Sequence, residues 1–100
     1  MTKYGAIRTN GYASKKEATR AHHLQLMQRA GVISDLREQV RYELVGKQEG
    51  ERPVSYVADF VYTDQQGHQV VEDAKGYRTP IYVLKRKLML LVHGIRIVEV

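Results

Sequence analysis

Residues 54–75 read VSYVADFVYTDQQGHQVVEDAK, and this stretch predicts a β-hairpin. Its first half, 54–63, is rich in valine and aromatic residues, which favour strands. A polar loop with glycine follows over 64–67, and a second strand is predicted over 69–75. We therefore expect two antiparallel strands joined by this loop, with the rest of the chain built around them.

The segment before the hairpin predicts one helix and one further strand. Ser14 and Glu17 have the spacing of a capping box at a helix start, and Gly31 suits the residue just past a helix end. A helix is therefore expected over about 15–30. Apolar and charged residues alternate over 39–45, which predicts a strand.

The segment after the hairpin predicts a second helix and a last strand. Thr79 suits the N-cap, Pro80 the first helical position and Gly94 the end of the helix. Residues 95–100 predict a short strand. The apolar face of this helix is expected to consist of Ile81, Leu84, Leu88, Leu91 and Val92.

These elements give an α/β (α+β) fold in the order α-β-β-β-α-β. One hundred residues suffice for one domain, expected over 14–100, preceded by a basic arm over 1–13. No apolar run approaches the ~18 residues that span a membrane, and no apolar segment follows the first basic residues as in a secretory signal. Together with the absence of cysteine, this favours the cytoplasm.

Charge is distributed unevenly along the chain. The net charge is +5, yet residues 38–74 hold eight of the 11 acidic side chains, while both flanking segments are basic. Basic surface attracts phosphate backbones. The acidic segment is explained either by solvated loops or by a cation site.

Two carboxylates and one ammonium group are expected to converge on the hairpin. Asp59 lies in the middle of an apolar strand, where an ionised carboxylate is costly without a partner. Side chains alternate along a strand, so Asp73 and Lys75 share one face and lie about 6–7 Å apart. Counting back from the loop can bring Asp59 opposite the region of Asp73. Two such carboxylates suit a hard divalent cation such as Mg²⁺.

Glu17 is a candidate third carboxylate, because it shares a helix face with Ala21 and Leu24. Each member of this group also has a simpler interpretation. Glu17 could serve only as a helix cap, Asp59 could pair with an arginine, and Asp73 with Lys75 could form a surface ion pair of little energy. Glu72, next to Asp73 but on the other face, remains a reserve ligand if the predicted register is wrong.

The chain resembles the PD-(D/E)XK nuclease superfamily, which includes type II restriction enzymes, archaeal Holliday-junction resolvases and phage endonucleases. It more closely resembles a small phage-borne family of otherwise uncharacterised proteins. The likeness covers nearly the whole chain. It is carried by Lys3-Tyr4-Gly5-Ala6, Ser14-Lys15-Lys16-Glu17-Ala18, Gly31-Val32-Ile33-Ser34-Asp35-Leu36 with Gln39, Tyr56-Val57-Ala58-Asp59-Phe60-Val61-Tyr62, Val71-Glu72-Asp73-Ala74-Lys75-Gly76, and Thr79 with Tyr82 and Lys85.

The resemblance implies a restriction-endonuclease-like core with a central mixed sheet flanked by two helices, a bound Mg²⁺ or Mn²⁺, a DNA substrate and a role in phage DNA metabolism. By the same likeness Asp59 and Asp73 match the metal carboxylates, Lys75 the motif lysine and Glu17 the helix glutamate. Ala58 stands where the motif has proline.

These observations lead to a hypothesis and its alternatives. The chain is expected to be a metal-dependent endonuclease acting on structured or branched DNA. Resolving a junction needs two cuts, so a homodimer is expected. A non-catalytic DNA-binding or phage assembly protein on the same fold is the alternative, and an RNA-cleaving enzyme is a third possibility. The basic residues expected to contact the DNA backbone are Lys15, Lys16, Arg78 and Lys85.

Overall fold

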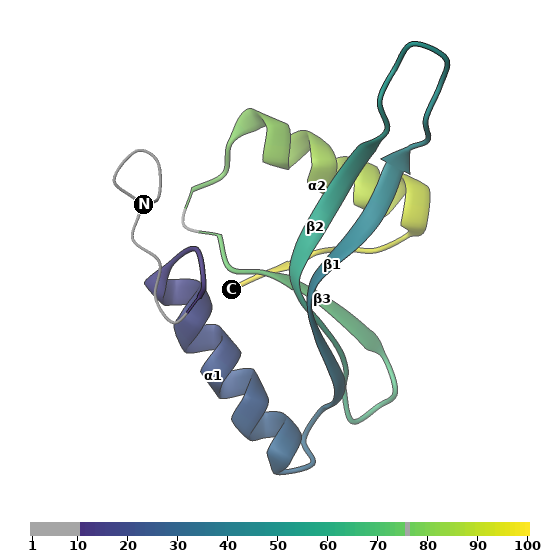
Figure 1. The fold of residues 1–100 in the computed structure, drawn as a ribbon. Coiled ribbons are helices and arrows are strands. Elements are labelled where there is room, and N and C mark those ends of the chain that lie inside the picture. The colour runs from purple at the N-terminus through teal and green to yellow at the C-terminus, as the bar shows by residue number, and fades with distance from the viewer. Residues whose placement is uncertain (1–10, 76) are drawn as a thin grey trace.

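The computed structural model describes residues 11–75 and 77–100, and it has the expected order α-β-β-β-α-β (Figure 1). The predicted basic arm over 1–13 lies mostly outside the described residues. Within them, no helix is both long enough and apolar enough to cross a membrane. The elements are α1 (Lys15–Arg29), β1 (Ser34–Val45), β2 (Val54–Thr63), β3 (Gln69–Asp73), α2 (Pro80–His93) and β4 (Val98–Glu99).

The four strands form one mixed sheet in the order β1-β2-β3-β4. The first three strands pair antiparallel, and β4 pairs parallel with β3. The hairpin register pairs Val61 with Val71 and Phe60 with Glu72. The predicted α+β class and the pairing of β2 with β3 are therefore confirmed.

The two helices pack against different faces of the sheet. Neighbouring residues of a strand point to opposite faces, and Val70 packs in a cluster with α1 while Val71 packs in a cluster with α2. The cluster beneath α1 consists of Ala21, Leu24, Ile33, Phe60 and Tyr62. The cluster beneath α2 consists of Leu44, Tyr56, Ala58, Val61, Val71, Tyr82, Met89 and Ile97.

Both helices begin and end close to the predicted positions. Ser14 Oγ accepts a hydrogen bond from the Glu17 amide at 3.0 Å, and Thr79 Oγ1 accepts one from the Tyr82 amide at 3.1 Å. These bonds satisfy amide groups that have no partner within the helix. Gly94 ends α2 with a φ of 68°, a left-handed backbone conformation that glycine adopts without strain.

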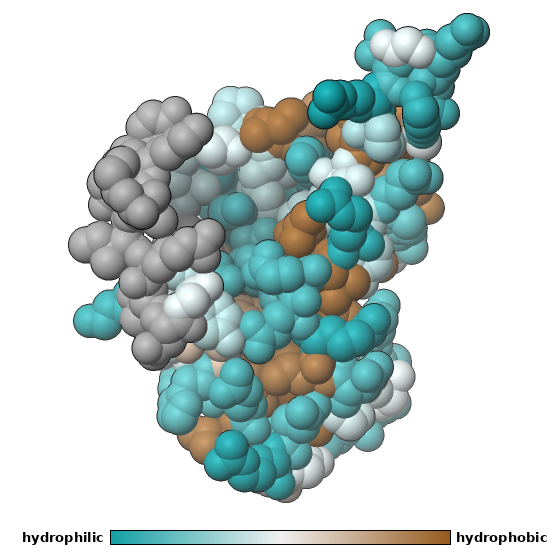
Figure 2. All heavy atoms as spheres, in the orientation of Figure 1, coloured by the Kyte–Doolittle hydropathy of each residue, from teal (hydrophilic) through white to brown (hydrophobic). Residues whose placement is uncertain are grey.

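The predicted apolar face of α2 was wrong except at Leu88, which is partly buried and packs against the core. Met89 and Tyr82 are the buried residues of this helix, whereas Leu91 is 79% exposed, Ile81 58% and Leu84 51% exposed. Apolar surface is visible over the beginning of α2 (Figure 2). The helix is rotated toward Tyr82 because that ring packs beside Tyr56 and its hydroxyl donates to Glu99 at 2.8 Å, contacts that hydrophobic periodicity does not encode.

Three strand boundaries also differ from prediction. β1 begins at Ser34 rather than at 39, because left-handed residues at Asp35 and Gln39 and a register shift interrupt the alternation that marks a strand. β3 ends at Asp73 rather than at 75, and the last strand is limited to Val98–Glu99. The next backbone amide after Asp73, that of Ala74, donates a hydrogen bond to the Asp59 side chain instead of to a neighbouring strand.

Candidate functional site

Asp59 and Asp73 face each other where the ladder between β2 and β3 ends. The last regular pair is Phe60 with Glu72, and one further step in this register reaches Asp59 and Asp73. Both carboxylates project on the face that carries Val61 and Val71. The expected convergence of two carboxylates from neighbouring strands is present.

Asp59 is half-buried and is held by two donors. Its Oδ2 accepts a hydrogen bond from the Ala74 backbone amide at 2.8 Å. This bond takes the amide that would otherwise extend the ladder, and it accounts for the end of β3 at Asp73. Asp59 Oδ1 accepts from Gln39 Nε2 at 3.4 Å. The alternative pairing of Asp59 with an arginine does not occur among the described residues.

Asp73 is only 2% exposed and is bound by two side chains. The Tyr56 hydroxyl donates to its Oδ2 at 2.6 Å, and Lys75 Nζ lies 3.4 Å from its Oδ1. Among the described residues, this Oδ1 is the buried side-chain atom without a hydrogen-bond partner. A buried carboxylate oxygen with incomplete hydrogen bonding has capacity for another positively charged ligand.

Lys75 lies beyond the end of β3, so the prediction that it continues the strand was wrong. Its ammonium group nevertheless meets Asp73, and it also lies 4.6 Å from the centroid of the Tyr82 ring. The Lys75 side chain is 32% exposed. It therefore stands between the buried carboxylate and solvent, where an anionic group can reach it.

Glu17 takes part in the cap of α1 and also places a buried carboxylate next to Gln39. Its backbone amide takes part in the cap of α1, while its carboxylate is buried and accepts from Gln39 Nε2 at 3.1 Å. The same Gln39 nitrogen donates to Asp59, so one amide group links the helix glutamate with the strand aspartate. Gln39 has a φ of 54°, an uncommon value for a residue other than glycine and one that concentrates at functional sites.

The carboxylates of this group repel one another. Burial, followed by the negative charges of Asp59 and Asp73, raises the pKa of Glu17. Burial also raises the pKa of Asp59, partly offset by the Ala74 amide, and the charge of Asp73 raises it further. A cation placed among these groups would relieve both the repulsion and the cost of burial.

Glu72, the reserve ligand, is bound by protein side chains on the other face of the sheet. Arg20 binds it through Nε at 2.8 Å and Nη2 at 2.6 Å, and the Tyr62 hydroxyl donates to the same carboxylate. Burial and this bond raise the pKa of Tyr62 to about 12. Glu72 thus belongs to a buried ion pair on the α1 face of the sheet, opposite Asp73.

Two open cavities meet at Asp59. One, of about 540 Å³, is lined by the carboxylates of Glu17, Glu38 and Asp59 together with Gln39. The other, of about 380 Å³, is lined by Asp59 and Asp73 and by three basic side chains, which belong to Arg41, Lys75 and Lys85. The site therefore has an acidic side and a basic side, with Asp59 on the boundary.

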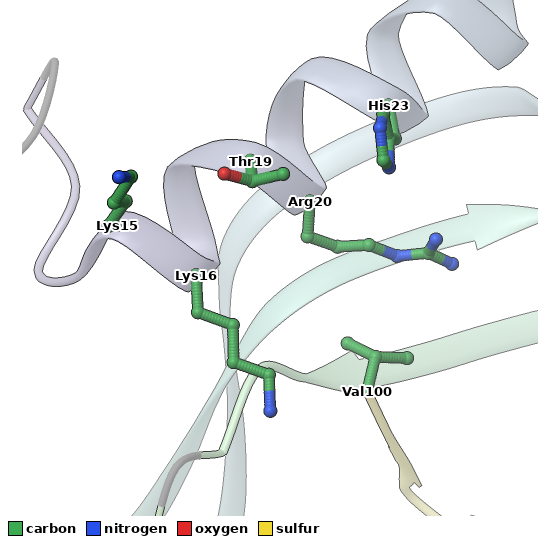
Figure 3. Close-up of a pocket in the computed structure, with 6 residues that line it drawn as sticks. All are labelled: Lys15, Lys16, Thr19, Arg20, His23 and Val100. Carbon is green, nitrogen blue, oxygen red and sulfur yellow. The ribbon is translucent and has the colours of Figure 1, made fainter.

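The structure separates the four predicted DNA contacts. Lys85 lines the basic cavity beside Asp73. Lys15 and Lys16 line a different pocket on α1 (Figure 3). Arg78 donates to Glu99 at 2.7 Å, and this pairing with Arg78 and the Tyr82 hydroxyl holds the pKa of Glu99 at about 2.

Sequence reasoning missed Gln39 and Arg41 as site residues. Both lie on β1, where Arg41 pairs with Val57 and Gln39 falls between the Glu38–Phe60 and Val40–Ala58 pairs. Both residues lie near Asp59 because of the register between β1 and β2. A register assigned to these two strands from the sequence would have identified Gln39 and Arg41.

The donor set fits a hard divalent cation with few protein ligands. Within the described residues, no three acidic or histidine side chains are placed closely enough to enclose an ion. Mg²⁺ commonly uses one or two carboxylates and completes its shell with water and substrate phosphate. Asp59 and Asp73, with the incompletely bonded Oδ1 of Asp73, meet that requirement.

Comparison with known proteins assigns the chain to a family whose function is not known. No curated protein and no solved structure matches it. A family model matches residues 1–94, and by it the chain belongs to the family described as "Protein of unknown function (DUF1064)".

Proposed function

We propose that this chain is a Mg²⁺- or Mn²⁺-dependent endonuclease of the PD-(D/E)XK type that hydrolyses phosphodiester bonds of DNA. One observation carries the proposal: Asp59 in β2 and Asp73 at the end of β3 lie on the same face where the ladder between the two strands ends, and Lys75 Nζ lies 3.4 Å from Asp73. Two carboxylates and an ammonium group at that spacing are what metal-assisted cleavage of a phosphodiester requires.

Each side chain has a defined part in this proposal. Asp59 and Asp73 would hold the metal ion, and Glu17 would add a negative charge on the acidic side. Once bound, the ion would supply an activated water molecule and offset charge on the scissile phosphate. Lys75 orients the attacking water and stabilises the negative charge that develops on the phosphate oxygens. The Tyr56 hydroxyl and the Ala74 amide orient the two aspartates, as outer contacts do for ligands in metal sites.

The basic cavity supports a phosphate-bearing substrate. Arg41, Lys75 and Lys85 line the same space as Asp73, so a phosphate placed beside the aspartates would meet three cationic side chains. Such contacts position a nucleic-acid backbone without reading its sequence. A substrate recognised by its shape, such as branched or otherwise structured phage DNA, agrees with that arrangement.

The proposed function also has consequences for the oligomeric state and the cellular location of the protein. Cutting both strands of a branched molecule requires two sites, so we include a homodimer. From the phage likeness we also infer that the protein acts in the cytoplasm of a bacterial host.

One observation favours a non-catalytic alternative. Gln39, Tyr56 and Lys75 provide protein contacts for Glu17, Asp59 and Asp73. A DNA-binding or phage assembly protein on this fold would use those contacts for stability alone. It would bind DNA in a salt-sensitive manner, with no metal dependence and no strand scission.

A cleavage assay separates the two functions. Labelled single-stranded, duplex and four-way-junction DNA, with RNA strands as a further arm, are incubated with Mg²⁺ or Mn²⁺. We expect cutting of at least one DNA substrate, abolished in Asp73→Asn while DNA binding in EDTA is retained. Asp35→Asn, at an exposed position of β1, is the matched control and should cut like the wild type. Folded protein that cuts none of the DNA substrates contradicts the proposal.

A further inference from the structure

A further pocket, besides the two cavities at Asp59, lies on α1. It has a volume of about 420 Å³ and lies between α1 and the chain segment that follows β4. Lys16 and Arg20 extend from α1 toward Val100 (Figure 3). The described residues that line it include no acidic side chain, and they are Lys15, Lys16, Thr19, Arg20, His23 and Val100. We call this the α1 pocket.

One of the basic side chains in the α1 pocket, that of Arg20, is held in place by an ion pair. Arg20 binds Glu72 through Nε and Nη2 at 2.8 and 2.6 Å, which fixes its guanidinium plane and offsets its charge. A guanidinium carries five N–H donors, so donors remain beyond those two bonds. The excess positive charge of the pocket therefore comes from Lys15 and Lys16, while Arg20 and Thr19 supply oriented donors.

The α1 pocket adjoins the candidate site through a single residue. Lys16 Nζ donates to the backbone oxygen of Lys75 at 3.0 Å. The side chain of that same Lys75 lies in the cavity with Asp59 and Asp73. The two basic cavities thus lie on either side of Lys75, one holding its side chain and the other reaching its carbonyl group.

We propose that the α1 pocket binds a backbone phosphate of the DNA strand that is cut, near the scissile phosphate. This inference rests on the proposed function for the identity of the strand. A phosphate fits the pocket for two reasons. Its oxygens can accept hydrogen bonds from lysine, guanidinium and hydroxyl donors, and its negative charge balances the positive charge of the two lysines. Two phosphates of one strand, held at the basic cavity and at the α1 pocket, would fix that strand on both sides of Lys75.

The histidine pair on α1 offers a matched test of this pocket. His23 lines the pocket, whereas its neighbour His22 is also exposed but is not part of the lining. Replacing either with glutamate changes the overall charge equally. Only His23→Glu puts a carboxylate beside the bound phosphate, so a difference between the two variants reports on the pocket rather than on net charge.

Binding is measured by fluorescence anisotropy in EDTA, with labelled single-stranded and duplex DNA, over a series of salt concentrations. We expect His23→Glu to weaken binding about tenfold more than His22→Glu. Lys15 makes no hydrogen bond or ion pair with the described residues, so Lys15→Ala should not disturb the fold. It should reduce the slope of log affinity against log salt by about 0.7–0.9, the value for one lost phosphate contact. Lys47→Ala, in the turn between β1 and β2, removes the same charge and should leave the slope unchanged.

These measurements separate failure of the pocket from failure of the function. Equal binding by the two histidine variants, or equal slopes for Lys15→Ala and Lys47→Ala, overturns the pocket even if the protein cuts DNA. If only labelled RNA strands respond to His23→Glu, the assignment to DNA is overturned. A clear difference with DNA in EDTA supports the pocket even if no DNA is cut in Mg²⁺, in which case the nuclease proposal alone fails.

Discussion

The Tyr56 hydroxyl donates a hydrogen bond of 2.6 Å to Oδ2 of Asp73. Tyr56 lies on β2 and Asp73 is the last residue of β3. The bond therefore links the two strands beyond their last backbone pair, Phe60 with Glu72. Burial, followed by the bond to Asp73, raises the pKa of Tyr56 well above its usual value. The hydroxyl is therefore a permanent donor that leaves Oδ1 of Asp73 as the oxygen available to a cation.

The variant Tyr56→Phe tests this orienting role. We expect it to weaken Mn²⁺ binding about 10-fold, the lower end of the range for losing an outer contact to a ligand, because the Asp73 carboxylate loses its fixed orientation. Isothermal titration calorimetry gives the affinity. Tyr42→Phe is the control, since Tyr42 is half-buried, packs edge-on against His93 and makes no side-chain hydrogen bond with the described residues. Equal affinities in wild type and Tyr56→Phe would show that the hydroxyl has no such role.

The raised pKa values of Glu17 and Asp59 predict a pH-dependent stability. A carboxyl group with a higher pKa in the folded state holds its proton more tightly there. Its contribution to folding is therefore complete below the ordinary values of 4.5 and 3.8 and is lost as pH rises through the raised values. In EDTA, we expect the free energy of unfolding in urea to contain a component that falls above about pH 4, and this component should be smaller in Asp59→Asn.

A bound divalent cation should reverse that loss. Mg²⁺ binds the ionised carboxylates of the folded chain, so it should stabilise the wild type most at neutral pH, by about 2.7 kcal/mol at one hundred times its dissociation constant. Urea denaturation with and without Mg²⁺ measures this directly. The hypothesis of a cation site is contradicted if Asp59→Asn gains as much stability from Mg²⁺ as the wild type does.

The shared amide of Gln39 predicts a second effect on the same carboxylates. Gln39→Ala removes the donor that Glu17 and Asp59 have in common, at 3.1 and 3.4 Å. We expect a loss of about 1 kcal/mol in the free energy of unfolding at pH values above the raised pKa values of the two groups, where both are ionised, and a smaller loss near pH 4. Gln65→Ala, in the exposed loop between β2 and β3, is the control and should show neither change. A loss that is the same at both pH values would assign Gln39 a purely steric role.

The sequence predicted the order of elements and the meeting of Asp59 with Asp73 because both depend on local signals. Helix caps at Ser14 and Thr79 and a short loop between two apolar strands are encoded by neighbouring residues. From the loop, the hairpin register follows by counting. The same counting places the two aspartates on one face.

The features that escaped prediction depend on contacts between distant segments. The rotation of α2 follows from Tyr82 binding Glu99, and the end of β3 follows from Asp59 binding the Ala74 amide. Gln39 reaches the site through a left-handed backbone on a strand whose register only the folded sheet defines. Each of these depends on side-chain hydrogen bonds that hydrophobic periodicity does not contain.

The neighbours Glu72 and Asp73 provide the sharpest contrast between a structural and a metal-binding carboxylate. Glu72 is 1% exposed and binds Arg20 on the α1 face, so Glu72→Gln leaves the Arg20 charge without its counter-ion. We expect this variant to lose about 2–3 kcal/mol of stability, less than for a fully buried pair because Arg20 is partly exposed, and to retain Mn²⁺ affinity. Asp73→Asn should show the reverse, with near-normal stability in EDTA and lost Mn²⁺ binding. Urea denaturation gives the stability of each variant, and calorimetry gives its Mn²⁺ affinity. If Glu72→Gln is the variant that loses the metal, the assignment of the ligand to Asp73 is wrong and the ion lies on the opposite face of the sheet.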